Sequence, residues 1–209
     1  LGHRMKHALT ILCFLLATSL DAAERDAPVF RAFPNPGSDW SIADDRQVGD
    51  GQFSWRHYMH EKTGDVIAIV AWHTPRFSID SGAVRQASIE TITSSGYAYA
   101  KTRKLGQPID DTVRHHVASI IVQHRGTAQK NIYRAIEYTY IYESADGESR
   151  SAMAHGYVVH IGEFTVFIQH TANRVITSDI AQSMAMDLAF AESNKLTPLP
   201  NGWSASISR

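Results

Sequence analysis

Histidine is the residue type in this chain best suited to chemistry, because it titrates near neutral pH and binds metals. The 209 residues include 11 histidines. His57 and His60, followed by Glu61, suggest a metal site, but residues three apart on a strand point to opposite faces. The helical zinc signature HExxH places both imidazoles on one face, and the order here is HxxHE. We therefore expect no metal at this pair.

Three further histidines, His116, His155 and His170, lie on predicted strands and are candidates for acid–base or binding roles. They would act together only if neighbouring strands brought them to one place with a carboxylate such as Glu137. The sequence does not define the strand register that decides this. The other interpretation is that half-exposed strands carry histidine as an amphipathic residue.

Other catalytic signatures are missing from the sequence. The serines lie outside any G-x-S-x-G motif, and the only cysteine, Cys13, lies in an apolar N-terminal run. The adjacent pairs Asp44-Asp45 and Asp110-Asp111 are typical of turns, where carboxylates bond local backbone. The net charge of -1 and the scattered basic residues argue against nucleic-acid binding. We expect no cofactor and assign no catalytic residue.

Aromatic residues provide a second set of candidates. Tyr138, Tyr140 and Tyr142 alternate along one predicted strand and share a face with Arg134. Most aromatic residues of the predicted strands should be core. If this face of the sheet is uncovered, it would form an aromatic surface suited to an apolar ligand or a protein partner. Arg134, Tyr138 and Tyr140 therefore join the three histidines as candidate binding residues.

These side chains are positioned by predicted strands and two predicted helices. Alternation and turn residues predict strands beginning at Trp40 and over 52–61, 66–73, 113–124, 131–143, 151–161 and 163–171, with helices over 78–95 and 178–194. Sequential hairpins in the second half predict an antiparallel meander. Pro198, Pro200 and Gly202 predict that regular structure ends after Asn194. We expect an α+β fold with a single antiparallel sheet of about six or seven strands and two main helices packed on it.

The N-terminus has the layout of a secretory signal peptide. Lys6 and His7 precede the apolar run 8–16, and small residues up to Ala23 provide cleavage sites. The run is shorter than the ~20 apolar residues that a membrane-spanning helix needs. We expect a signal peptide over 1–23, with 1–4 as an upstream extension, and export to the periplasm or beyond. Residues 24–209 then form a single α+β domain with its core at about 29–194.

The order of elements resembles the PsbP-like fold group, which includes photosystem II extrinsic subunits and small exported bacterial proteins. Three features carry the resemblance: Phe33-Pro34 and Trp40 before a strand, a hairpin followed by the helix 78–95, and the strand 164–170 running into the helix 178–194. It covers roughly 29–194. The resemblance implies an accessory or binding module, and it supplies no catalytic motif.

The combined observations favour an exported accessory or binding module of the cell envelope that is not an enzyme. Its expected partner is an envelope protein or a small apolar ligand. We expect no nucleic acid partner and no integral membrane segment after signal removal. The alternative is a small ligand-binding protein or hydrolase-like enzyme with a histidine-containing pocket between sheet and helix.

Overall fold

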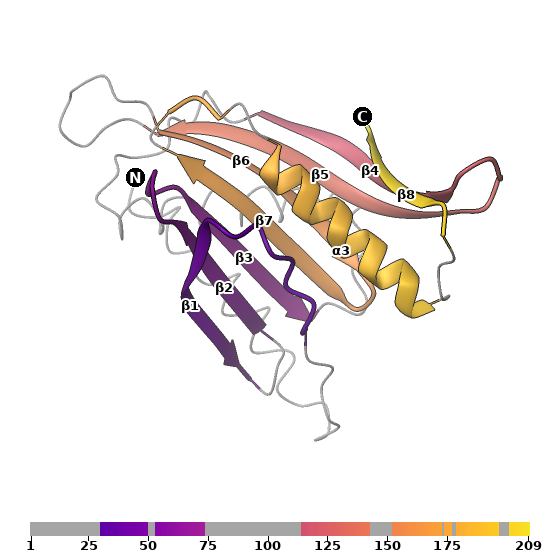
Figure 1. Ribbon diagram of the computed structural model, residues 1–209, viewed down its shortest axis with the longest axis horizontal. Coiled ribbons are helices and arrows are strands. Elements are labelled where there is room, and N and C mark those ends of the chain that lie inside the picture. Colours follow the sequence, from indigo (N-terminus) through magenta and orange to yellow (C-terminus); the bar gives the residue numbers. More distant parts are fainter. Residues whose placement is uncertain are drawn as a thin grey trace, which may run out of the picture.

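The computed structural model describes residues 30–49, 53–73, 114–142, 152–172, 174–176, 179–196 and 201–209. These residues form one antiparallel sheet and a helix (Figure 1). The elements in chain order are β1 (Trp40–Val48), β2 (Phe53–His60), β3 (Val66–His73), β4 (Arg114–His124), β5 (Lys130–Tyr142), β6 (Ala152–Ile161), β7 (Phe164–Ala172), α3 (Ile180–Leu196) and β8 (Trp203–Ser208).

The strands lie in the order β1-β2-β3-β7-β6-β5-β4-β8. Consecutive hairpins pair β4 with β5, β5 with β6 and β6 with β7, which is the meander expected from the sequence. β7 then pairs with β3, so the N-terminal strands extend the same sheet. After α3 the chain returns to the sheet at the edge opposite β1, where β8 pairs with β4. β1 and β8 are therefore the two edges.

The predicted fold class was wrong in its strand and helix counts. The sheet has eight strands rather than six or seven, and the described residues contain one helix rather than two, so the described part of the chain is mostly β. The additional strand is β8, which begins right after Gly202, at the point where regular structure was expected to be over. Proline ends a helix but does not prevent a strand from starting a few residues later. The predicted helix 78–95 lies outside the described residues, as do 1–23 and the pair Asp110-Asp111.

β1 is also longer than the sequence suggested, because it continues through Asp44-Asp45 instead of bending there. A register shift between Ile42 and Asp44 marks a β-bulge in its pairing with β2. Asp44 accepts a hydrogen bond from Trp55 Nε1 at 3.0 Å. Asp45 pairs with Arg56 at 2.6 Å. The two carboxylates therefore bond side chains of the neighbouring strand, rather than the backbone of a local turn as the sequence suggested.

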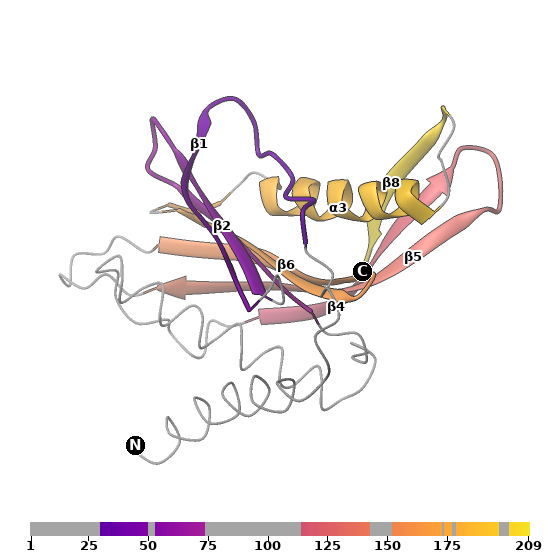
Figure 2. The ribbon, with the colours of Figure 1, turned by 90° about the horizontal axis from the view of Figure 1, so that it is seen from below.

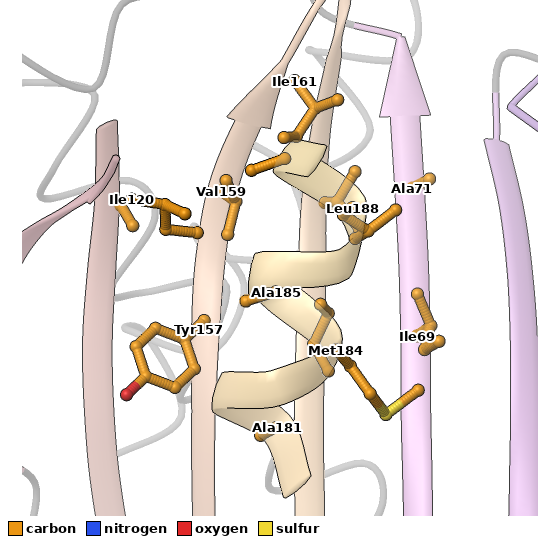
Figure 3. Packing of buried hydrophobic residues seen from close by; sticks show 14 of the residues in the cluster. Ile69, Ala71, Ile120, Tyr157, Val159, Ile161, Ala181, Met184, Ala185 and Leu188 are labelled. Atoms are coloured by element: carbon orange, nitrogen blue, oxygen red, sulfur yellow. The ribbon is translucent and has the colours of Figure 1, made fainter. Parts of the chain in front are cut away.

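One face of the curved sheet packs against α3 (Figure 2). The helix side of this core consists of Ala181, Met184, Ala185, Leu188 and Ala189, which repeat at helical spacing and are buried. The sheet contributes inward residues from β3, β4, β6 and β7. They include Ile168 of β7, together with Ile69, Ile120 and Val159 (Figure 3). The three alanines let the helix backbone approach the sheet closely.

A second buried cluster lies on the opposite face of the sheet. It contains Ile136, Tyr138, Tyr140, Ala154, Val158 and Phe167. Tyr138 crosses directly over Gly156, its partner on β6. A Cβ atom at Gly156 would lie 2.3 Å from the Tyr138 hydroxyl and 2.4 Å from the Ile168 carbonyl oxygen. Glycine is required here because the aromatic ring and the neighbouring strand fill the space.

Candidate functional site

Four buried polar residues lie on the sheet face that carries α3. They are Glu137 on β5, His155 on β6, His170 on β7 and Asp65 just before β3, and we call them the buried polar row. His155 and His170 are direct partners in the pairing of β6 with β7. All four residues are at most 8% exposed. The row therefore follows from strand register, which places these alternating residues on one face.

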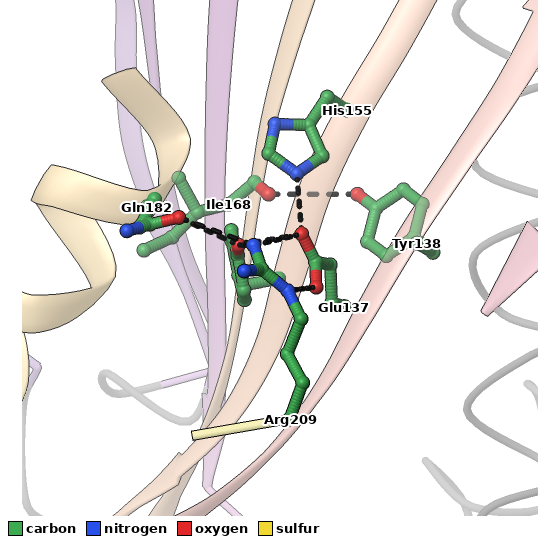
Figure 4. A network of polar contacts seen from close by, with 7 residues as sticks. Glu137, Tyr138, His155, Ile168, Gln182 and Arg209 are labelled. Carbon is green, nitrogen blue, oxygen red and sulfur yellow. Dashed lines mark hydrogen bonds and ion pairs between the residues drawn. The ribbon is translucent and has the colours of Figure 1, made fainter. Parts of the chain in front are cut away.

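Glu137 is at the centre of the first half of the row (Figure 4). Its Oε1 pairs with His155 Nε2 at 3.1 Å and accepts a hydrogen bond from the Tyr157 hydroxyl at 2.8 Å. Arg209, the residue after β8, donates from Nε to Oε2 at 2.5 Å and from Nη2 to Oε1 at 2.8 Å. Arg209 Nη2 also donates to Gln182 of α3 at 3.3 Å. The network thus joins β5, β6, β8 and the helix.

The hydrogen bonds around Glu137 determine its charge state. Those from Arg209, Tyr157 and His155 stabilise the carboxylate, outweigh the effect of burial and lower the pKa of Glu137 to about 2. Burial and the adjacent Glu137 carboxylate raise the pKa of Tyr157 far above its usual value. At neutral pH Glu137 is therefore an anion and Tyr157 a neutral hydrogen-bond donor.

Asp65 holds the other half of the row together. Its Oδ2 pairs with His170 Nε2 at 3.0 Å, and its Oδ1 accepts a hydrogen bond from Arg174 Nη1 at 2.5 Å. Burial opposes ionisation, but the hydrogen bonds from Arg174 and His170 outweigh it and lower the pKa of Asp65. For His170 burial is the larger effect, so its pKa is lowered despite the adjacent carboxylate. His170 Nδ1 is buried without a hydrogen-bond partner.

The two halves meet at the pair of histidines. In strand order the row reads Glu137, His155, His170 and Asp65, with an arginine on each carboxylate. Each imidazole has its Nε2 bonded to a carboxylate, which fixes the ring orientation. Such an arrangement compensates the charges of the two buried carboxylates and crosslinks neighbouring strands. It leaves the carboxylates poorly suited to accept a further proton.

The structure brings together some of the predicted site residues and separates the others. His155 and His170 are partners on adjacent strands, and His155 bonds Glu137, whereas the carboxylate that bonds His170 is Asp65. His116 lies opposite Glu137 in the register of β4 with β5, but its side chain is exposed. Arg134 is exposed and donates to Ser119 Oγ at 3.3 Å.

The two candidate tyrosines lie on the other side of the sheet and are buried. Tyr138 and Tyr140 are 1% and 2% exposed, so they do not form a surface for a partner. Both hydroxyls donate to Gln169 Oε1, at 3.2 and 2.6 Å. Gln169 in turn donates to Thr171 at 3.0 Å. The described contacts of these tyrosines are those of core residues.

Sequence reasoning missed the charged partners of the row. Asp65 follows a Lys-Thr-Gly hairpin loop and resembles an ordinary turn residue, but it is 3% exposed. Arg174 follows β7, and Arg209 lies beyond the expected end of regular structure. A detectable signal was the strict alternation of Trp203, Ala205 and Ile207 with serines, which indicates the strand that delivers Arg209.

Within the described ranges, no three His, Cys, Asp or Glu side chains lie close enough together to hold a metal ion. No helix in the same ranges is sufficiently long and apolar to cross a membrane. Comparison of the chain with protein-family models and with curated proteins finds no match. The PsbP-like resemblance stays a prediction.

Proposed function

We propose that the protein is an exported, non-enzymatic accessory or binding module of the cell envelope. The observation that carries the proposal is that the two carboxylates of the buried polar row are already bonded to charged and hydrogen-bonding side chains. Both of its carboxylates are bonded to an arginine and a histidine. These groups serve to hold strands and helix in place.

The electrostatics support the same conclusion. A general base works best when its pKa lies near the operating pH. Glu137, with a pKa of about 2, is far too weak a base, and Tyr157, with its raised pKa, stays protonated. Asp65 is likewise held ionised by Arg174 and His170. Export rests on the N-terminal layout of the sequence, a basic start followed by a short apolar run and small residues.

The experiment combines localisation with capture of the partner. An affinity tag inserted after Ala23 stays on the protein if the signal peptide is removed, and it leaves Arg209 undisturbed. We expect the tagged protein in the exported fraction and an envelope component crosslinked to it in intact cells. A matched strain with the apolar run disrupted by Leu12→Arg should retain the protein in the cytoplasm and lose the crosslink. Cytoplasmic localisation of the unaltered protein would refute the proposal.

The second candidate function is that of a ligand-binding protein or hydrolase-like enzyme with a histidine-containing pocket, and one observation favours it. His155 and His170 lie opposite each other, and the buried Nδ1 of His170 has no partner. A hydrolase-like activity would require these rings. Purified protein should then cleave p-nitrophenyl acetate, and His155→Gln and His170→Gln should each reduce the rate at least about tenfold. Under our proposal the unaltered protein and the two variants cleave the ester at the same rate, because the background reaction of exposed histidines such as His115 and His116 is unchanged by either substitution.

A further inference from the structure

The two edges of the sheet differ in their protection against pairing with another strand. β1 has a bulge between Ile42 and Asp44, and three consecutive charged residues, Asp44, Asp45 and Arg46. Bulges and charges are the usual means by which an edge strand avoids adding another chain. β8, with the sequence WSASIS, has no charged residue and no proline. Of these protective features, the described residues give β8 only a short length.

One side of β8 is occupied and the other is not. On the occupied side its six residues pair with β4, from Trp203 opposite His124 to Ser208 opposite Ser119. In the described part of the chain no strand pairs with its other side, because β8 ends the sheet. Backbone N–H and C=O groups on that side are therefore available to a partner strand. Arg209, bonded to Glu137, anchors the end of β8 and keeps this edge in a fixed position.

The side chains of β8 make the strand complementary to itself. Trp203, Ala205 and Ile207 point to the helix side, pack against the core and remain only partly buried. Ser204, Ser206 and Ser208 are exposed on the other face. An antiparallel pair of β8 strands centred on Ala205 places Ser204 opposite Ser206 and Trp203 opposite Ile207. Centred on Ser206, it places Ser204 opposite Ser208, Ala205 opposite Ile207 and Trp203 opposite Arg209. No like charges meet in either register.

We propose that β8 pairs with β8 of a second copy of this chain about a two-fold axis. The pairing joins two eight-stranded sheets and completes the burial of the apolar side of β8. A second copy fits this edge because the strand is self-complementary, as a two-fold interface requires, and has no charged residue that would meet its own copy. A six-residue ladder is a small interface, so the dimer is weak and forms in a concentration-dependent way. The inference is independent of the proposed function, since it uses none of the polar row.

The test is sedimentation velocity over a wide range of concentrations. We expect the unaltered protein to change reversibly from monomer to dimer. S204K/S206K and S204E/S206E each place like charges across the axis in both registers and should weaken the dimer about tenfold. Mixing the two variants should restore dimer formation, because opposite charges then face each other. S41K/Q47K, exposed positions on β1, is the matched control and should leave the dimer unchanged.

Each other outcome counts against the proposal. A protein that stays monomeric at every concentration would overturn the proposal. This holds even if a different protein is found to bind the edge of β8. A dimer that tolerates both charged variants, or that fails to reform in the mixture, would place the interface elsewhere. Thermal unfolding checks that every variant is folded. Loss of the dimer in a folded variant can then be assigned to the changed edge of β8. Failure of envelope localisation would refute the proposed function and leave this result unaffected.

Discussion

The guanidinium of Arg209 forms two hydrogen bonds with the carboxylate of Glu137, at 2.5 and 2.8 Å. This ion pair joins the end of β8 to β5, two strands away across the sheet, and lies next to the helix residue Gln182. The last strand of the sheet is therefore held by a side chain as well as by its pairing with β4. Four expected outcomes follow from this pair, from the buried polar row and from the packing on the other face.

Replacing Arg209 with methionine should destabilise the fold. Glu137 stays buried in that variant and keeps only its hydrogen bonds from His155 and Tyr157. We expect the free energy of unfolding to fall by about 1–2 kcal/mol, less than for a fully buried pair because the Arg209 side chain is 54% exposed. Urea denaturation measures this loss. In the Glu137→Gln background the same change should cost much less, and equal costs would show that the pair contributes nothing.

Acidification should weaken the fold through Glu137. The pKa of its carboxyl is about 2 in the folded protein, below its ordinary value of 4.5, so the folded state favours the ionised form. The resulting stabilisation is present above pH 4.5 and is lost as the pH falls towards 2. We expect it to amount to about 2 kcal/mol after allowance for the exposed arginine. Chemical denaturation at a series of pH values should show a smaller loss for Glu137→Gln than for the unaltered protein.

Acidification should also weaken the fold through His170, and this loss should begin at a higher pH than the loss through Glu137. Asp65, Arg174 and His155 lie around its ring, and burial lowers its pKa below 6.5. The unfolded chain therefore takes up the proton first, and stability falls as the pH decreases from about 6.5 towards the folded value. His170→Gln, which keeps a donor for Asp65, should remove this slope. His115→Gln, at an exposed histidine of β4, is the control and should keep it.

Gly156→Ala should be among the most damaging small substitutions. The new Cβ would lie 2.4 Å from the Ile168 carbonyl oxygen and even closer to the Tyr138 hydroxyl. We expect a loss of about 3 kcal/mol in the free energy of unfolding, because neither the strand nor the packed ring can move freely. Gly64→Ala provides the comparison. The new Cβ would meet no atom within 4 Å there, and the only strain comes from the backbone φ of +71°. That variant should lose about 1 kcal/mol. Similar losses in the two variants would contradict the steric explanation.

Much of the local structure could be predicted from alternation and turns. The strands expected over 113–124, 131–143, 151–161 and 163–171 correspond to β4, β5, β6 and β7 within one residue at each end. The expected helix 178–194 corresponds to Ile180–Leu196. These elements were predictable because burial of one face imposes a period of two on strands and 3.6 on helices. β8 was missed because the prolines before it were given more weight than its own alternation.

The candidate site was predictable only in its residue types. The sequence by itself determined that His155, His170 and Glu137 lie on strands, and that their side chains alternate with core residues. Only the tertiary structure decided that they share the face of α3, that His155 is opposite His170, and that Asp65, Arg174 and Arg209 complete the row. The physical reason is register: pairing of strands distant in the chain depends on the packing of the whole sheet, and a shift of one residue reverses every side chain.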